Sequence, residues 1–436
     1  MKRKVLTLFC LVCSSAMTLM AAELESTPVP RSSSVNLEQP LTLSAALQRA
    51  SNLNPALQQA KIAVSSFEGA YRHADTPVPS NPVVSLQSFD QGTGSGQVNR
   101  SIGITVSQEL WIAGQGGLRE QAAGARLQAA RQRLDFLSAT IAARTRAAFM
   151  RALVAREAVE TAEQIVNANQ DLSDFSELRL ESGEANQLEA NTARIGLGQA
   201  QALLAQAENQ FEQATYRLID LLWLDPAQAL ELSGVVSPVE LEVPGQEELL
   251  TRAVQRRSDL AAASEQVMAA QNELKLANRQ LIPNLTVFAV KNSDINIDSS
   301  VLAGLSFELP VLHRFGGERQ QAAAQLDQAL LERDSLNLSV RSEILSALSA
   351  YRAARRSLSS MSEEVLNSAT QNLELTRIAF ETGEVDATAL SIAQSVLVNT
   401  RNEHLRALND LVVAGTELER ASGGILILSN VDSANN

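Results

Sequence analysis

Residues 179–184 read Arg-Leu-Glu-Ser-Gly-Glu, and residues 379–384, which lie 200 positions later, read Ala-Phe-Glu-Thr-Gly-Glu. The correspondence extends upstream, where the run Gly-Gly-Leu-Arg at 116–119 matches Gly-Gly-Glu-Arg at 316–319. Similarity at so long a fixed spacing indicates that one structural unit was duplicated. Each motif of this chain is therefore expected to occur as a pair.

The motifs at 179–184 and 379–384 each lie at the end of a long helical pattern. Residues 120–182 contain no proline and a single glycine, and residues 318–382 contain neither residue type. We expect an uninterrupted helix before each motif, a turn at Gly183 or Gly383, and a second helix that runs back. Small apolar residues at close-packing spacing predict coiled-coil-like contacts between the helices: Ala122, Ala123, Leu127, Ala130, Leu134 and Leu137.

A β-hairpin is expected before each long helix. Apolar residues alternate with small or polar ones at about 100–111 and 300–310, and weaker strands at about 82–90 and 283–291 precede them. Period-two alternation separated by turn-rich links predicts four strands in two hairpins. The polar members of this alternation, which would face a water-filled lumen or the outside of a soluble sheet, are Thr105, Ser107, Ser306 and Glu308.

Shorter helices are expected before each pair of strands. Residues 42–75 read as helix with a new start near Asn54-Pro55, because proline is tolerated in a first helical turn, and residues 246–282 repeat the pattern. Trp111 ends a strand, where it would mark a membrane interface or pack at a joint. The expected divisions are a signal peptide at 1–22, an extended tail at 23–40, a first repeat at 41–222, a proline-containing joint at 223–245, a second repeat at 246–422 and a tail at 423–436.

The N-terminus has the pattern of a secretory signal peptide. Three basic residues, Lys2-Arg3-Lys4, precede an apolar stretch and the small-residue site Ala21-Ala22. A retained membrane anchor is the alternative, although the stretch is short for a span. Both cysteines, at 10 and 13, fall inside this segment, and no lipid-anchor pattern surrounds them. The mature chain is therefore expected to use no disulfide or thiolate chemistry.

Composition excludes several classes of function. The formal net charge is −13 and no basic cluster appears, which argues against nucleic acid as a partner. Aromatic residues make up 4% and apolar residues 45%, with Ala and Leu making up the difference, which is typical of long helices. The three histidines are scattered, so we expect no metal site, no cofactor and no catalytic set, and the chain is not predicted to be an enzyme.

Export, alternating strands and the lack of an apolar run of helical span length favour strands in an outer membrane. Four strands cannot close a barrel, whereas three copies of the chain supply an even number within the usual range. The long helices would then leave the membrane and form a tube.

At this point the chain resembles the TolC-type outer membrane efflux channels, over roughly residues 41–422. The resemblance rests on the paired strand entries Pro82 and Pro283, the paired glycines after each hairpin, the two tip motifs, and the run Ser-Gln-Glu-Leu at 107–110. Moderate length and the absence of a lipid cysteine are most similar to the CzcC-like branch, which serves heavy-metal exporters.

This resemblance implies a mainly α fold with a small membrane β part. Long antiparallel helical hairpins would form a tube in the periplasm, and two β-hairpins per chain would close a 12-stranded barrel in a homotrimer in contact with outer membrane lipid. It further implies a periplasmic adaptor and an inner-membrane pump of the resistance–nodulation–division type, with heavy-metal cations as cargo. Two alternatives stay open: drugs or proteins as cargo, and a periplasmic coiled-coil structural or adaptor protein.

The resemblance also implies an entrance, narrowed by acidic side chains, at the helix tips. The candidate tip and gate residues are Gly183, Glu184, Glu189, Gly383, Glu384 and Asp386. The second repeat departs from the family pattern, because Ala389 and Ile392 stand where gate aspartates are expected. The alternative is that these acids satisfy helix N-termini and that the two glycines only form turns.

Overall fold

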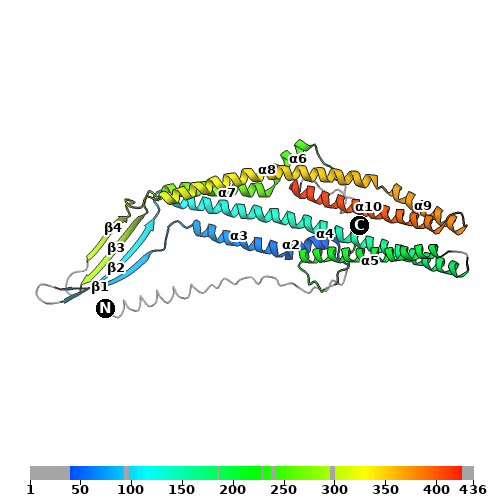
Figure 1. The fold of residues 1–436 in the computed structure, drawn as a ribbon. Helices are drawn as coiled ribbons and strands as arrows, with labels where there is room; N and C mark the ends of the chain where they lie inside the picture. Colours follow the sequence, from blue (N-terminus) through cyan, green and yellow to red (C-terminus); the bar gives the residue numbers. More distant parts are fainter. Residues whose placement is uncertain are drawn as a thin grey trace. The chain divides into compact units, whose positions relative to one another are not determined.

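The computed structural model describes residues 40–92, 98–183, 186–227, 229–236, 241–294 and 300–424, and therefore leaves the expected signal peptide and most of both tails outside it. The chain runs twice through the same series of two short helices, two strands and a long helical hairpin (Figure 1). Its helices are α2 (Leu43–Leu53), α3 (Pro55–Ala74), α4 (Gln115–Glu181), α5 (Gln187–Leu222), α6 (Gln246–Arg256), α7 (Ser258–Arg279), α8 (Gly316–Ser360), α9 (Glu363–Glu381) and α10 (Ala387–Ala421).

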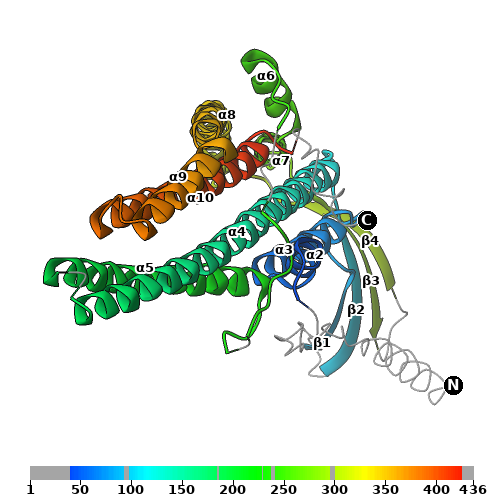
Figure 2. The ribbon, with the colours of Figure 1, turned by 90° about the vertical axis from the view of Figure 1, so that its right-hand side faces the viewer.

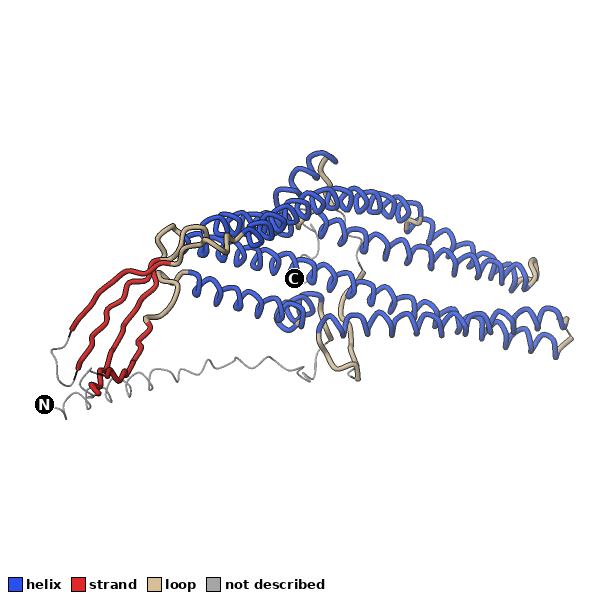
Figure 3. The backbone as a smooth tube through the Cα atoms, turned by 60° about the vertical axis from the view of Figure 1, so that its left-hand side comes forward, coloured by secondary structure: helices blue, strands red, loops and turns tan. Residues whose placement is uncertain are grey.

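The four strands form one antiparallel sheet in the order β1-β2-β3-β4 (Figure 3). They are β1 (Val83–Gly92), β2 (Val98–Leu110), β3 (Leu285–Asp294) and β4 (Ser300–Phe307). Pairing of β2 with β3 joins the hairpin of the first repeat to that of the second. Leu110 and Leu285, for example, are paired although 175 positions separate them in the sequence.

The break between α2 and α3 lies where the sequence places it. Asn54 separates the helices, and its side-chain oxygen accepts a hydrogen bond from the backbone nitrogen of Ala56 at 3.0 Å. Its amide nitrogen donates to the carbonyl oxygen of Leu221 at 2.9 Å, which ties this corner to the end of α5. In the second repeat the equivalent break between α6 and α7 is at Arg257, without a proline.

α4 is a single helix of 67 residues and agrees with the uninterrupted pattern in the sequence. It contacts α5 on one side and α10 on the other (Figure 2). Alanines supply many of its buried side chains, including Ala129 and Ala152, each 0% exposed. Side chains this small let the helix axes approach closely, and the packing rather than a strong amphipathic stripe holds the hairpin.

The second long helix is broken, and the expectation of an uninterrupted helix over 318–382 is wrong. α8 ends at Ser360 and α9 begins at Glu363. The hydroxyl groups of Ser359 and Ser360 both donate to the carbonyl oxygen of Arg356, at 2.8 and 3.0 Å, and so compete with the helical backbone bonds. The freed carbonyl oxygen of Met361 instead accepts a hydrogen bond from His404 Nδ1 on α10 at 2.6 Å.

Two similar cores lie where the short helices cross the long ones. One contains Leu41, α2, the middle of α4 and the end of α5, and the other contains Leu241, α6, the middle of α8 and the end of α10. Tyr351 is 2% exposed, and its hydroxyl accepts a hydrogen bond from the backbone nitrogen of Leu241 at 2.9 Å. This bond fixes the joint between the repeats to the second repeat, and Leu232 of the joint packs in the core of the first. Among the described residues, no helix has the length and apolar character needed to cross a membrane.

Trp111 lies at the joint between β2 and α4. Its ring is half-buried, and Arg119 lies over it with 5.6 Å between the guanidinium carbon and the ring centroid. The ring also occupies the space beside Gly116, where an added Cβ would lie 2.6 Å from Trp111 Cε3. The packing at this joint supports the second of the two interpretations of Trp111.

Replacing Gly116 with alanine is expected to displace this ring. Overpacking of this kind costs about 1–3 kcal/mol, and the tryptophan fluorescence should shift to longer wavelength as the ring becomes wetter. Gly117→Ala is the matched control, because an added Cβ at Gly117 meets nothing within 4 Å. Identical spectra for the two variants would contradict the packing assigned to Trp111.

Candidate functional site

The sheet has two chemically different faces. Directly paired residues and alternate residues of a strand share a face, and Thr105 is paired with Ser85 and Val290. Three of the four predicted lumen residues, Thr105, Ser107 and Ser306, lie on this face, whereas Glu308 follows one residue after β4 ends. Further small or polar residues on this face are Gln87, Gly103, Glu109, Thr286, Asn292, Ser300 and Gly304, and the apolar ones are Val83, Phe288, Val290 and Leu302.

The opposite face is almost entirely apolar and uncovered. Its large side chains are Val84, Leu86, Ile102, Ile104, Val106, Val287, Val301, Leu305 and Phe307, all of them exposed in the single chain. Leu305, for example, is 65% exposed. Among the residues of this face whose side chains the structure describes, the basic one is Lys291. It lies three positions before the end of β3, where a long side chain can reach a polar boundary. A contiguous exposed apolar surface of this kind indicates contact with a membrane or a partner.

Both outer edges of the sheet are open. Within the described chain, β1 pairs only with β2 and β4 pairs only with β3. Backbone groups along such edges need partners if the apolar face is to enter a membrane, because lipid offers none. The sheet is therefore incomplete as a membrane element in one chain.

The first helix tip is a glycine turn followed by a capped helix. Gly183 has a φ of 81°, a left-handed conformation that favours glycine. The side chain of Asn186 accepts a hydrogen bond from the backbone nitrogen of Glu189 at 3.0 Å and so caps α5. Glu184 lies outside the described residues.

Glu189 is paired within the tip instead of projecting freely. Arg179 Nη1 on α4 donates to Glu189 Oε1 at 2.9 Å, and the Arg179 guanidinium also lies 5.6 Å from the ring centroid of Phe380 on α9. Phe380 packs with Leu172 and other buried residues in a small core between the two tips. Sequence reasoning missed Arg179 and Phe380, although a signal existed. Both members of the Arg179–Glu189 pair become alanine, at 379 and 389, in the second repeat.

The second tip is built differently. Gly383 has a φ of 77°, and the carboxylate of Asp386 accepts a hydrogen bond from the backbone nitrogen of Ala389 at 2.9 Å. Asp386 therefore caps α10, while Glu384 is exposed. Among the tip residues that the structure describes, no three acidic side chains of one chain form a cluster that could hold a cation. The small core around Phe380 instead lies between the two hairpins.

Both repeats of the chain match one known protein family. A family model described as outer membrane efflux protein matches residues 46–222 and 249–424. The chain belongs to the outer membrane efflux protein family. The two matched segments correspond to the two rounds of helices and strands.

Individual relatives cover most of the efflux protein. The cobalt-zinc-cadmium resistance protein CzcC of Cupriavidus metallidurans is 25% identical over 393 residues, which span 88% of this chain and 90% of that protein. Protein CyaE of Bordetella pertussis is 28% identical over 401 residues, which span 85% and 82% of the two chains. The crystal structure of the Campylobacter jejuni CmeC outer membrane channel has the same fold, with a TM-score of 0.76, 15% identity, and coverage of 90% of this chain and 88% of that one.

Family membership locates this efflux protein in the outer membrane, with its helical part in the periplasm. Within the described residues, no group of three or more His, Cys, Asp or Glu side chains is arranged to hold a metal ion. His313 pairs with Glu318 at 3.0 Å on the surface, and His404 is engaged at the break between α8 and α9. The surfaces that bear on the family's function are the two faces of the sheet, its edges and the tips.

Proposed function

We propose that this efflux protein is the outer membrane channel of a tripartite exporter and assembles as a homotrimer. The observation that carries the proposal is the sheet, which has one polar face, one exposed apolar face and two open edges in the same chain. Pairing of β4 with β1 of the next copy would satisfy both edges, and three copies would form a closed barrel of twelve strands. Thr105, Ser107 and Ser306 would then face the water-filled interior, and Glu308 would lie near its periplasmic rim.

The tips would form the periplasmic entrance and meet the adaptor. The turns at Gly183 and Gly383 form the ends of the two helical hairpins. Both glycines are exposed, and both are distant in sequence from the strands. In our proposal Glu184, Glu384 and Asp386 supply negative charge around the entrance in three copies. Glu189 acts differently, by holding the first tip against Arg179. A periplasmic adaptor and an inner-membrane pump of the resistance–nodulation–division type would deliver the cargo.

For the cargo we propose heavy-metal cations. The support is the similarity to CzcC, whose name describes cobalt, zinc and cadmium resistance. A channel needs no tight metal site for this role, because it has to release its cargo. The similarity to the pyoverdine export outer membrane protein OpmQ of Pseudomonas putida, 25% identical over 350 residues, keeps a larger organic cargo as the second candidate.

Deletion of the gene is expected to sensitise the parent cell to cobalt, zinc or cadmium and to leave its resistance to a panel of drugs unchanged. The measurement is growth across a concentration series, with the wild-type gene restored as the control. Sensitivity to drugs alone would keep the channel and overturn the metal assignment. A protein that stays monomeric when extracted gently from the outer membrane would overturn the trimer.

A further inference from the structure

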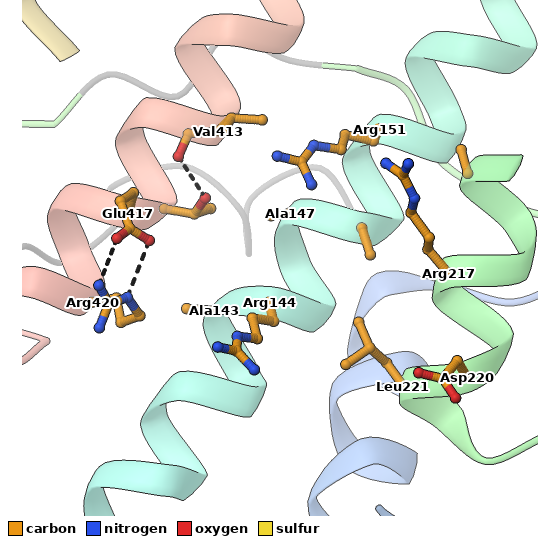
Figure 4. A pocket seen from close by; sticks show the side chains of 13 residues that line it. Ala143, Arg144, Ala147, Arg151, Arg217, Asp220, Leu221, Val413, Glu417 and Arg420 are labelled. Carbon is orange, nitrogen blue, oxygen red and sulfur yellow. Dashed lines mark hydrogen bonds and ion pairs between the residues drawn. The ribbon is translucent and has the colours of Figure 1, made fainter. Parts of the chain in front are cut away.

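Arginines gather in a groove between α4, α5 and α10 (Figure 4). The groove has a volume of about 390 Å³ and is floored by alanines such as Ala147 and Ala214. Its charged lining comprises Arg144 and Arg151 on α4, Arg217 and Asp220 on α5, and Glu417 and Arg420 on α10. Four guanidinium groups thus meet two carboxylates in a chain whose formal net charge is −13.

One of the two carboxylates is already engaged. Arg420 Nη2 donates to Glu417 Oε1 at 2.5 Å, and Arg420 also pairs with Glu343 on α8. The hydrogen bond from Arg420 is the main cause that lowers the pKa of Glu417, and the positive charge of Arg144 contributes to the same shift. Glu417 is therefore an anion at neutral pH, and its charge is largely matched by Arg420.

The other three guanidinium groups make no direct contact with an acidic side chain among the described residues. Across the part of the chain that the structure describes, Arg144, Arg151 and Arg217 make no hydrogen bond and no ion pair. Figure 4 shows Arg144 and Arg151 extending from α4 toward α10, and Arg217 extending from α5 toward α4. Three guanidinium groups share the groove with one further carboxylate, that of Asp220, so an excess of positive charge remains that a bound anion would offset.

Arg144 and Arg151 project from the side of α4 that the joint between the repeats does not cover. The opposite side carries Phe149 and Leu153, which contact the joint at Gly234, and Arg156, which donates to the carbonyl oxygen of Leu232 at 2.6 Å. At 100° per residue, Arg151 points about 160° away from Phe149. The interior of a channel has to stay open. The joint, which packs on α4, would therefore lie on the outer side of the channel wall. The uncovered side, with Arg144 and Arg151, is then the inner wall.

We propose that Arg144, Arg151 and Arg217 form a binding site for a multivalent oxyanion. Guanidinium groups bind phosphate and carboxylate oxygens through paired, charge-assisted hydrogen bonds, and three of them around one groove match an anion that carries several charges. The location on the inner wall rests on the proposed channel function. In a trimer, nine such groups form a belt that draws anions into the lumen, so that a metal cation crosses this level together with anionic ligands.

The binding test uses the purified full-length protein and isothermal titration with inorganic pyrophosphate and, separately, citrate. Replacing all three arginines by glutamine is expected to weaken binding by at least roughly tenfold, because charge-assisted hydrogen bonds to ionised groups are stronger than those between neutral groups. The control replaces three scattered, acid-paired surface arginines, Arg333, Arg377 and Arg406, by glutamine, which changes the net charge equally. Binding of pyrophosphate alone would identify phosphate as the source of the oxyanion, and binding of citrate alone would identify carboxylate. The proposal is overturned if neither ligand binds the wild type, or if the control loses as much affinity as the variant.

A second experiment separates this site from the channel function. In planar bilayers with a potassium chloride gradient, the reversal potential of the wild type should indicate a higher anion permeability than that of the Arg144→Gln, Arg151→Gln, Arg217→Gln variant. An unchanged reversal potential in a conducting channel overturns the belt. A wild-type protein that binds pyrophosphate but conducts no ions would overturn the proposed channel function and leave the proposed binding site standing.

Discussion

Replacing Arg257 with methionine is expected to lower the free energy of unfolding by about 3 kcal/mol. Arg257 is 4% exposed at the break between α6 and α7. Its guanidinium donates to Asp259 Oδ2 at 2.6 Å, to Glu343 Oε2 at 2.5 Å and to the carbonyl oxygen of Ala421 at 3.1 Å. One side chain therefore joins α7, α8 and the end of α10. Methionine would leave Asp259 without its cation and Glu343 with Arg420 alone.

The expected loss in the free energy of unfolding is at the low end of the usual cost of breaking a buried ion pair, for two reasons. Asp259 and Glu343 remain partly accessible, with side chains 15% and 30% exposed, and Glu343 keeps its pair with Arg420. Burial by itself would lower the pKa of Arg257, but the bonds to Asp259 and Glu343 outweigh it and raise the pKa above its usual value. The balance of these opposing effects indicates that the network is favourable as built.

The measurement is the urea dependence of far-ultraviolet circular dichroism of the detergent-purified protein. Arg257→Lys should recover part of the loss, because lysine keeps the charge but not the forked geometry. Arg252→Met, which removes an exposed i,i+4 pair with Glu248, should cost less than about 1 kcal/mol. Equal effects at Arg257 and Arg252 would contradict the structural role assigned to the buried network.

Replacing Val106 with arginine is expected to prevent accumulation of the protein in the outer membrane. Val106 lies on the apolar face of β2 between Val84 and Ala289 and is 45% exposed in the single chain. An arginine facing lipid near the midplane of a strand costs about 2–4 kcal/mol. A trimer would repeat that cost in each of its chains.

Thr105→Arg is the control, because Thr105 is the neighbouring residue on the polar face. The same side chain is added to the same strand, but it faces the opposite side of the sheet. Membrane fractionation and heat-resistant trimers on gels should therefore distinguish the variants, with Thr105→Arg close to wild type. Loss of Thr105→Arg alone would reverse the assignment of the two faces, and loss of both proteins would contradict the expected difference between them.

The helix tips illustrate how far local sequence rules reach. The glycine turns at 183 and 383 follow from backbone sterics, which depend only on the residue itself. The strand pattern of β2 is equally local, because alternation depends on a period of two. The same rules do not predict the break at Met361, because no glycine or proline is present there. A hydrogen bond from His404, 43 residues away in the sequence, helps to stabilise it.

The candidate functional residues divide in the same way. Thr105, Ser107 and Ser306 could be placed on one face from alternation, whereas the pairing of β2 with β3, which makes that face continuous, joins residues far apart in sequence. The sequence also marked Glu189 as an acid near a tip, but its pairing with Arg179 depends on how two helices pack. The arginine groove appears nowhere in the sequence pattern, because its members come from three helices.

The duplication, the two hairpins of strands, the helical hairpins with their glycine turns, and the family all follow from local periodicity or from motifs in order, so they can be read from the residues alone. Which charges are neutralised depends instead on how the helices pack. Arg257 and Arg179 are paired, while Arg144, Arg151 and Arg217 make no ion pair or hydrogen bond in the described chain. Electrostatic pairing depends on distances of a few ångströms between side chains on different helices, and the helix packing sets those distances.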